Sequence, residues 1–160
     1  MRILIVGLGG IGQRHVRNIR ALLGERAEIM AWRVRRLSHV VTPTLQSDAS
    51  LDVEKVYGIR VFEALESALA ERPQVAFICN PSSLHVPPAL ACLRAGCDLF
   101  LEKPVSHNLD GLAELMNVVV RCSDRVQGPS TPGIRYVSDF VLDFDSLRGD
   151  QVSVKFAKPS

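Results

Sequence analysis

The chain has 160 residues, a length typical of one domain, and 47% of them are hydrophobic, enough for a sizeable core. Its formal net charge of +2 is too small to indicate binding to nucleic acid or to an anionic membrane. No apolar run reaches the roughly 18 residues of a membrane-spanning helix, and no signal-peptide pattern precedes the first strand. We therefore expect a cytoplasmic protein with neither a nucleic-acid nor a membrane partner.

The four cysteines match no metal-binding or disulfide pattern. They are scattered, and none belongs to the C-x-x-C pair typical of zinc sites and redox motifs: Cys79, Cys92, Cys97 and Cys122. We expect free thiols in a reducing compartment rather than disulfides or metal ligands, and we predict no metal site.

Strands and helices alternate along the chain. Residues 2–6 are apolar and predict a buried strand, and the glycine-rich turn after it opens a helix that runs to about Leu23. Further strands are predicted at residues 27–32, 59–62, 74–79 and 97–101. Further helices are predicted at residues 51–57, 63–72 and 82–95, with a last one that reaches about residue 122. This order predicts an α/β fold, a Rossmann-type doubly wound parallel sheet with helices on both faces.

Local composition also predicts one long loop and the N-terminal caps of two helices. Residues 38–50 are mostly polar, and we interpret them as a loop. Ser82 or Ser83 is expected to cap the helix that follows the fourth strand, and Ser106 or Asn108 to cap the last one.

The chain divides into a dinucleotide-binding domain at residues 1–122 and a short tail at residues 123–160. The tail opens with a Gly- and Pro-rich cluster at residues 128–133, and residues 134–137 and 151–156 could form strands. Four aspartates in the tail match no calcium-binding loop, so we interpret them as solvated carboxylates: Asp139, Asp143, Asp145 and Asp150.

The turn after the first strand has the G-x-G-x-x-G pattern of dinucleotide-binding proteins. Gly7 allows a tight turn, Gly9 lets the backbone approach a pyrophosphate, and Gly12 lets the helix pack close to the sheet. The helix N-terminus then faces the phosphate charge. A glycine-rich turn without a ligand is the alternative, but the strand before it and the helix after it favour the binding role.

Ligands of such sheets bind beyond the carboxyl ends of the strands. Four segments end strands at that edge and should converge in space: residues 7–12, 32–36, 80–83 and 102–104.

The end of the second strand bears on the choice of cofactor. An acidic residue is usual there for NAD, where it binds the ribose 2′-hydroxyl, but this sequence has Trp32 and Arg33 and no nearby acid. Arg33, Arg35 and Arg36 could bind a 2′-phosphate, which slightly favours NADP over NAD, or could simply begin a solvated loop. Trp32 or Arg33 could also stack on the adenine.

Lys103 is the one candidate catalytic group. It follows the fifth strand, between an acid and a proline, where it could donate a hydrogen bond or a proton to a substrate oxygen. A surface lysine in a turn is the alternative. His85 could face the cofactor or cap a helix, whereas His15 and His39 belong to no detectable constellation.

Three segments together resemble a known family: G-L-G-G-I-G-Q-R-H at residues 7–15, C-N-P-S-S-L-H at 79–85 and A-G-C-D-L-F-L-E-K-P at 95–104. This combination, over about residues 1–122, is similar to the Gfo/Idh/MocA family. The family includes glucose–fructose oxidoreductase, inositol dehydrogenase and related NAD(P)-dependent sugar oxidoreductases.

The resemblance implies roles that spacing alone does not show. Lys103 would be the catalytic lysine, the Lys103–Pro104 peptide could be cis, and Glu102 would lie near the nicotinamide ribose. Asn80, Pro81 and His85 would line the cofactor pocket. The complete predicted cofactor site is Gly7, Gly9, Gly10, Ile11, Gly12, Trp32, Arg33, Arg36, Asn80, Pro81, Ser82, His85, Glu102, Lys103 and Pro104.

Two departures from the family pattern affect these expectations. Members continue into a second α/β domain that supplies most of the substrate pocket, and residues 123–160 are too few for it. We therefore expect that domain to be missing, in a truncated product, an excised domain or a diverged short member. Residues 126–133 belong to the same departure, because they stand where a sixth strand is usual. The second departure is Arg33, which stands where many relatives have an acid.

Two functions fit this sequence. The first is the NAD(P)-binding part of an oxidoreductase that transfers hydride between a nicotinamide cofactor and a sugar, nucleotide sugar or cyclitol. The second is a non-catalytic NADP-binding or regulatory module without a substrate domain. We also expect apolar surface where a second domain would pack, which could drive formation of a homo-oligomer.

Overall fold

The computed structural model describes residues 1–33, 39–41, 46–124, 134–135, 140–141 and 155–156. Its centre is a six-stranded sheet in the order β5-β2-β1-β6-β7-β8, and every pairing in it is parallel. The strands are β1 (Arg2–Val6), β2 (Glu28–Trp32), β5 (Arg60–Phe62), β6 (Val75–Ile78), β7 (Asp98–Leu101) and β8 (Ile134–Arg135). The chain winds outward from β1 to β5, then returns beside β1 and winds the other way, so the predicted doubly wound α/β fold is confirmed.

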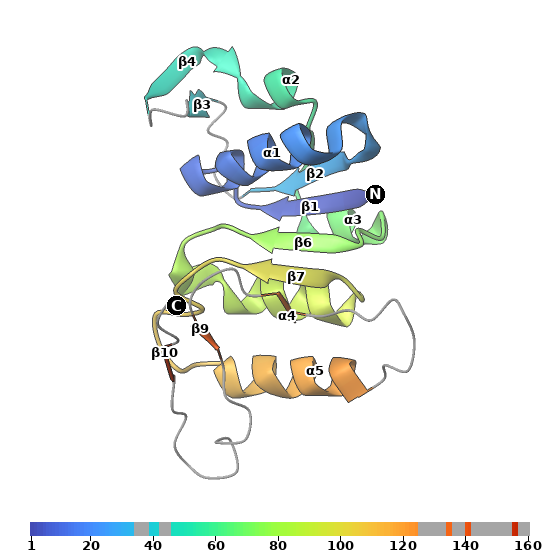
Figure 1. Cartoon of the computed structure of the whole chain (residues 1–160), viewed down its shortest axis with the longest axis vertical. Helices are drawn as coiled ribbons and strands as arrows, with labels where there is room; N and C mark the ends of the chain where they lie inside the picture. Colours follow the sequence, from blue (N-terminus) through green and yellow to red (C-terminus); the bar gives the residue numbers. More distant parts are fainter. Residues whose placement is uncertain (34–38, 42–45, 125–133, 136–139, 142–154, 157–160) are drawn as a thin grey trace.

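Helices cover both faces of the sheet (Figure 1). One face packs against α1 (Gly10–Leu23) and α2 (Val53–Tyr57), with the short helix η1 (Gly24–Arg26) after α1. The other face packs against α3 (Leu65–Ala70), α4 (Val86–Arg94) and α5 (Leu112–Asp124). Two separate apolar cores result, because alternate residues of β1 point to opposite faces: Ile3 and Ile5 to one, Leu4 and Val6 to the other.

Local sequence explains several element boundaries. The Asp52 carboxylate accepts a hydrogen bond from the Glu54 N–H at 2.9 Å and so caps α2. Gly58, with φ of 59°, ends the same helix in the left-handed conformation that glycine adopts readily. The described ranges hold no helix that combines the length and the apolar character needed to cross a bilayer.

The predicted loop at residues 38–50 is wrong where the structure describes it. His39–Val41 (β3) and Ser47–Asp52 (β4) pair as antiparallel strands. Two side chains of α1 hold β3: the Val41 N–H donates to Gln13 Oε1 at 2.7 Å, and Arg17 Nη1 donates to the Val41 carbonyl at 2.7 Å. The strand is therefore supported by tertiary hydrogen bonds that composition does not reveal.

Two helix starts also differ from the prediction. The segment after β6 forms the short helix η2 (Ser82–Leu84) before α4 begins at Val86, and no side chain caps either helix. The last helix begins at Leu112, because Ser106 and Asn108 accept hydrogen bonds from backbone N–H groups two residues further on.

The tail is described only in part. The predicted strand at residues 134–137 is confirmed over β8, which takes the sixth position in the sheet beside β7. Of residues 151–156, Lys155–Phe156 (β10) pairs with Phe140–Val141 (β9). The cluster at 128–133 and the four tail aspartates lie outside the described residues.

Candidate functional site

The ends of four strands converge at the carboxyl edge of the sheet. The Gly7 N–H donates to the Trp32 carbonyl at 2.9 Å, the Cys79 N–H to Val6 at 2.8 Å, and the Glu102 N–H to Ile78 at 3.1 Å. These bonds extend the parallel register beyond the strands. The predicted juxtaposition of the turns after β1, β2, β6 and β7 is confirmed, except for residues 34–36, which the structure does not describe.

The three motif glycines differ in what surrounds them. Gly7 has φ of +95°, and a Cβ there would lie 2.8 Å from the Asn80 nitrogen. A Cβ on Gly12 would lie 2.0 Å from the Gly7 carbonyl oxygen. A Cβ on Gly9 would meet no described atom within 4 Å. Gly7 and Gly12 are therefore required by the fold itself, whereas Gly9 leaves room beside the backbone for a ligand.

The start of α1 suits an anionic group. Gly9 is its N-cap and offers no side chain to the first N–H groups, and the first turn has no acidic residue. No acidic side chain of the first turn therefore neutralises the positive end of the helix dipole, which can interact with an anionic ligand. Gly10 and the 44% exposed Ile11 border this cradle. The residues present thus fit a dinucleotide pyrophosphate.

Gln13 stiffens the glycine-rich turn, a role that the sequence did not indicate. It is 1% exposed; its Nε2 donates to the Leu8 carbonyl at 3.1 Å and its Oε1 accepts from the Val41 N–H. One buried amide therefore ties the turn to the β3–β4 hairpin. A polar residue on the inward face of α1, directly after Gly12, was the available signal.

The end of β2 is held by one partner from the turn before α3 and by another from α2. The Trp32 indole N–H donates to the Glu63 carbonyl at 3.3 Å, and the ring packs against the core beneath α3 and α4. Arg33 forms an ion pair with Glu54, in the first turn of α2. No acid neighbours the end of β2 in the sequence, but α2 brings Glu54 there from 21 positions along the chain.

The turn after β6 contains two buried polar atoms of interest. Asn80 Nδ2 donates to the Leu84 carbonyl at 2.7 Å, and His85 Nε2 lies 2.6 Å from the Asn80 carbonyl oxygen. Since that carbonyl can only accept, Nε2 carries a proton and donates to it. Neither His85 Nδ1 nor Asn80 Oδ1 has a hydrogen-bond partner among the described residues. The His85 ring, 2% exposed, folds back on the turn and makes no side-chain cap.

The turn after β7 presents the candidate catalytic lysine. Lys103 is exposed, and the Lys103–Pro104 peptide is cis, as the resemblance implies. The Glu102 carboxylate turns inward, with Oε1 2.5 Å from His15 Nε2 and Oε2 3.3 Å from the Lys103 N–H. The turn that carries Lys103 is thus anchored to α1.

His15 joins the glycine-rich segment to the lysine turn, although the sequence gave no sign of this role. It lies one turn into α1, and its ring is 4.8 Å from Phe100 and 5.2 Å from Phe77, centroid to centroid. The two phenylalanines stack on each other at 4.9 Å. Ring packing and the Glu102 bond together fix the His15 side chain.

The described cysteines are free thiols, as predicted, and the side chain of Cys122 is not described. Burial, helped by the Glu102 carboxylate, raises the pKa of Cys79. A hydrogen bond between Cys92 and Cys97 raises the pKa of the first thiol and lowers that of the second. No group of three or more His, Cys, Asp or Glu side chains in the described ranges is placed to hold a metal ion.

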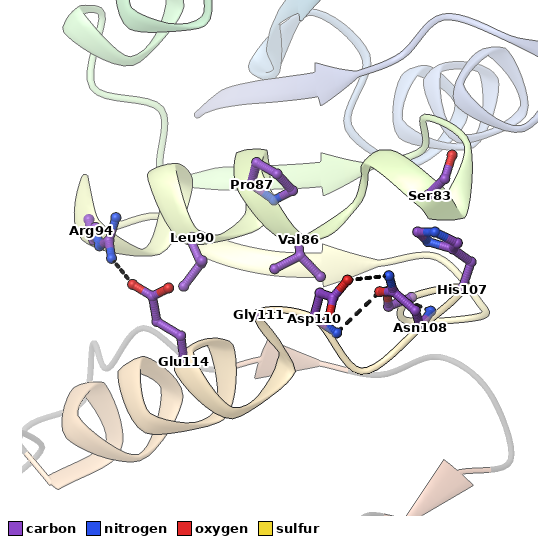
Figure 2. A pocket seen from close by; sticks show the side chains of 11 residues that line it. Ser83, Val86, Pro87, Leu90, Arg94, His107, Asn108, Asp110, Gly111 and Glu114 are labelled. Carbon is purple, nitrogen blue, oxygen red and sulfur yellow. Dashed lines mark hydrogen bonds and ion pairs between the residues drawn. The ribbon is translucent and has the colours of Figure 1, made fainter.

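A groove of about 520 Å³ lies between α4 and α5 (Figure 2). Val86, Pro87 and Leu90 form its apolar wall, polar residues of the loop before α5 lie at one end, and the Arg94–Glu114 ion pair lies at the other. None of the predicted cofactor residues lines it. The candidate site is therefore the open carboxyl edge rather than this groove.

Comparisons with known proteins agree with this geometry. The family model described as "Oxidoreductase family, NAD-binding Rossmann fold" (GFO_IDH_MocA) matches residues 1–128. A myo-inositol 2-dehydrogenase of Thermotoga maritima is 30% identical over 115 residues, which cover 68% of this chain and 30% of the relative.

Solved structures give the same fold. A scyllo-inositol dehydrogenase from Lactobacillus casei, with bound NAD(H) and scyllo-inositol, has a TM-score of 0.60 at 23% identity and covers 85% of this chain and 35% of its own. The WlbA dehydrogenase from Bordetella pertussis, in complex with NADH and UDP-GlcNAcA, has a TM-score of 0.57 at 25% identity. The match covers 76% of this chain and 34% of the WlbA chain.

The chain spans about a third of the length of these relatives. The family match, in contrast, covers most of the chain and includes all four turns of the carboxyl edge. This chain is a member of the Gfo/Idh/MocA oxidoreductase family and contains its NAD-binding Rossmann-fold domain.

Proposed function

We propose that this chain is the NAD(P)-binding part of an oxidoreductase that acts on CH–OH groups of a sugar, nucleotide sugar or cyclitol. One observation carries the proposal: the N-terminus of α1, which has no side-chain cap and lies among the three spaced glycines, shares a sheet edge with an exposed lysine that directly precedes a cis proline. Relatives with a similar fold are dehydrogenases bound to NAD(H) or NADH together with a cyclitol or a nucleotide sugar.

Each segment of the edge has a distinct task in this proposal. Residues 7–12 and the first turn of α1 hold the pyrophosphate. Asn80, Pro81, Ser82 and His85 line the cofactor pocket, where Asn80 Oδ1 and His85 Nδ1 are buried polar atoms without a hydrogen-bond partner among the described residues. Glu102, held by His15, lies beside the nicotinamide ribose. The nicotinamide supplies the hydride chemistry when it is bound.

Lys103 acts on the substrate oxygen. Its ammonium group donates a hydrogen bond to the reacting hydroxyl or carbonyl and can move a proton to or from it. The ammonium is exposed, while its own backbone N–H is tied to Glu102, so the side chain can reach a substrate above the edge.

The proposal slightly favours NADP over NAD, because Arg33 and Arg36 follow β2 and a guanidinium pairs well with a phosphate. The buried thiols support a location in the reducing cytoplasm. A homo-oligomer is part of the proposal, because apolar surface is expected where a second domain would pack.

Calorimetric titration of the chain with NADPH and with NADH tests the cofactor role. Gly9→Ala is the informative variant, because its methyl group has room in the fold but enters the space assigned to the pyrophosphate. We expect a loss of affinity of at least about tenfold, with at most about 1 kcal/mol lost in stability from the poorer N-cap. Glu114→Gln is a control, because Glu114 pairs with Arg94 and belongs to none of the four turns of the edge.

The catalytic role has a separate test. If the chain oxidises any member of a panel of sugars and cyclitols, Lys103→Ala should lower kcat by about 10²- to 10⁴-fold. Coenzyme binding without turnover of the panel would instead support the alternative, a non-catalytic NADP-binding or regulatory module. Absence of binding to either coenzyme would refute both.

A further inference from the structure

Arg33 and Glu54 form an ion pair in which both charges are partly withdrawn from water. The Arg33 side chain is 10% exposed and the Glu54 side chain 35%. Arg33 directly follows β2, and Glu54 lies in the first turn of α2. The pair therefore joins two elements that are separated along the chain by the β3–β4 hairpin.

The position of Glu54 is set by the backbone. The Asp52 carboxylate caps α2 through the Glu54 N–H at 2.9 Å, and the Glu54 carbonyl accepts from the Gly58 N–H at the other end of the helix. The same carbonyl also accepts from the Ile59 N–H at 2.9 Å. A loss of charge at Glu54 thus leaves the capping of α2 intact.

The pair lies where dinucleotide-binding folds recognise the adenosine ribose. β2 is the neighbour of β1, with Trp32 opposite Val6, so Arg33 follows β2 beside the glycine-rich turn. At this position an acid accepts a hydrogen bond from the ribose 2′-hydroxyl of NAD, whereas an arginine accommodates the 2′-phosphate of NADP. This chain places both groups there and pairs them with each other.

We propose that Glu54 is a specificity-determining residue that limits the preference for NADP by neutralising Arg33. Its carboxylate competes with a 2′-phosphate for the guanidinium and repels the phosphate charge. It also offers an acceptor to a ribose 2′-hydroxyl. The inference rests on the proposed cofactor role. It adds Glu54 of α2 to the residues that act on the cofactor, on the evidence of its ion pair with Arg33.

The test is the ratio of the dissociation constants for NADH and NADPH in wild type and in Glu54→Gln. The amide keeps the size and an acceptor oxygen but removes the charge. We expect NADPH to bind about tenfold more tightly, the size of one charge-assisted hydrogen bond, while the NADH constant changes by less than about threefold. Glu114→Gln is the matched control, because Glu114 also lies in the first turn of a helix and pairs with an arginine, Arg94.

The double variant Arg33→Ala/Glu54→Gln keeps the proposal falsifiable if the single change lowers stability. It lacks both charges, so it should lose the gain in NADPH affinity that Glu54→Gln shows alone. An unchanged NADH-to-NADPH ratio in Glu54→Gln, with both coenzymes bound, would overturn the role of Glu54 and leave the cofactor proposal standing. Failure of the wild type to bind either coenzyme would overturn the cofactor proposal itself.

Discussion

The glycine-rich turn after β1 and the ends of β2 and β7 form one edge but are built by different means. In the turn, backbone geometry decides: Gly7 has positive φ, and Gly12 has no room for a side chain. At the other two ends, long side chains meet across the fold, Arg33 with Glu54 and His15 with Glu102. The first kind of site is set by neighbours in sequence, the second by residues 21 and 87 positions apart.

The difference explains which parts of the edge tolerate change. A Cβ added at Gly7 or Gly12 cannot be accommodated by a change in another side chain, because the atoms that it would meet belong to the backbone. An ion pair or hydrogen bond can be exchanged for another pair at moderate cost. We therefore expect stability to depend mainly on the turn and selectivity mainly on the long-range pairs.

Gly12→Ala should have the largest effect. Its Cβ would lie 2.0 Å from the Gly7 carbonyl oxygen, so α1 would have to shift away from the sheet, at a cost of about 3 kcal/mol or more in unfolding free energy. Urea unfolding followed by circular dichroism measures this loss. Gly10→Ala is the control, because its Cβ would be an ordinary 3.8 Å from Val41, and it should unfold within about 1 kcal/mol of wild type. Equal midpoints for the two variants would contradict the steric explanation.

The same division separates what the sequence predicted from what it did not. The strand at residues 2–6, the structural roles of Gly7 and Gly12, and the convergence of four strand ends follow from local pattern, and the structure has them as expected. The β3–β4 hairpin was missed because Gln13 and Arg17 hold it from α1. Glu54 was missed as a partner of Arg33 because only the path of the chain through the hairpin and α2 brings it to β2. Periodicity carries no information on such contacts.

His15→Phe should have the next largest effect. Phenylalanine keeps a ring against Phe77 and Phe100 but leaves the Glu102 carboxylate without its 2.5 Å partner, at a cost of about 2 kcal/mol. Thermal unfolding gives the stability, and NADPH titration reports whether the lysine turn moves.

A double-mutant cycle with Glu102→Gln isolates the pair, and we expect a coupling of about 1 kcal/mol or more. Additive effects of the two changes would show that the His15 ring contributes by packing alone. In that case the end of β7 would depend on apolar contacts, as the cores do, and the contrast with the glycine-rich turn would be weaker.

Cys79, at the end of β6, gives the smallest expected effect. Burial and then the Glu102 carboxylate raise its pKa in the folded protein above the ordinary value, so the folded state keeps the thiol proton where the unfolded chain loses it. The sign follows from linkage: this contribution is fully present below the unfolded pKa of about 8.5 and is lost as the pH rises above it, by at most about 1.4 kcal/mol per pH unit. Urea unfolding between pH 7 and pH 10 should therefore show that the free energy of unfolding declines less steeply with pH for Cys79→Ala than for wild type. The hydrogen-bonded thiols of Cys92 and Cys97 are present in both proteins, so they cancel in this comparison. Parallel declines would mean that Cys79 ionises freely in the folded protein and that the Glu102 charge does not act on the end of β6.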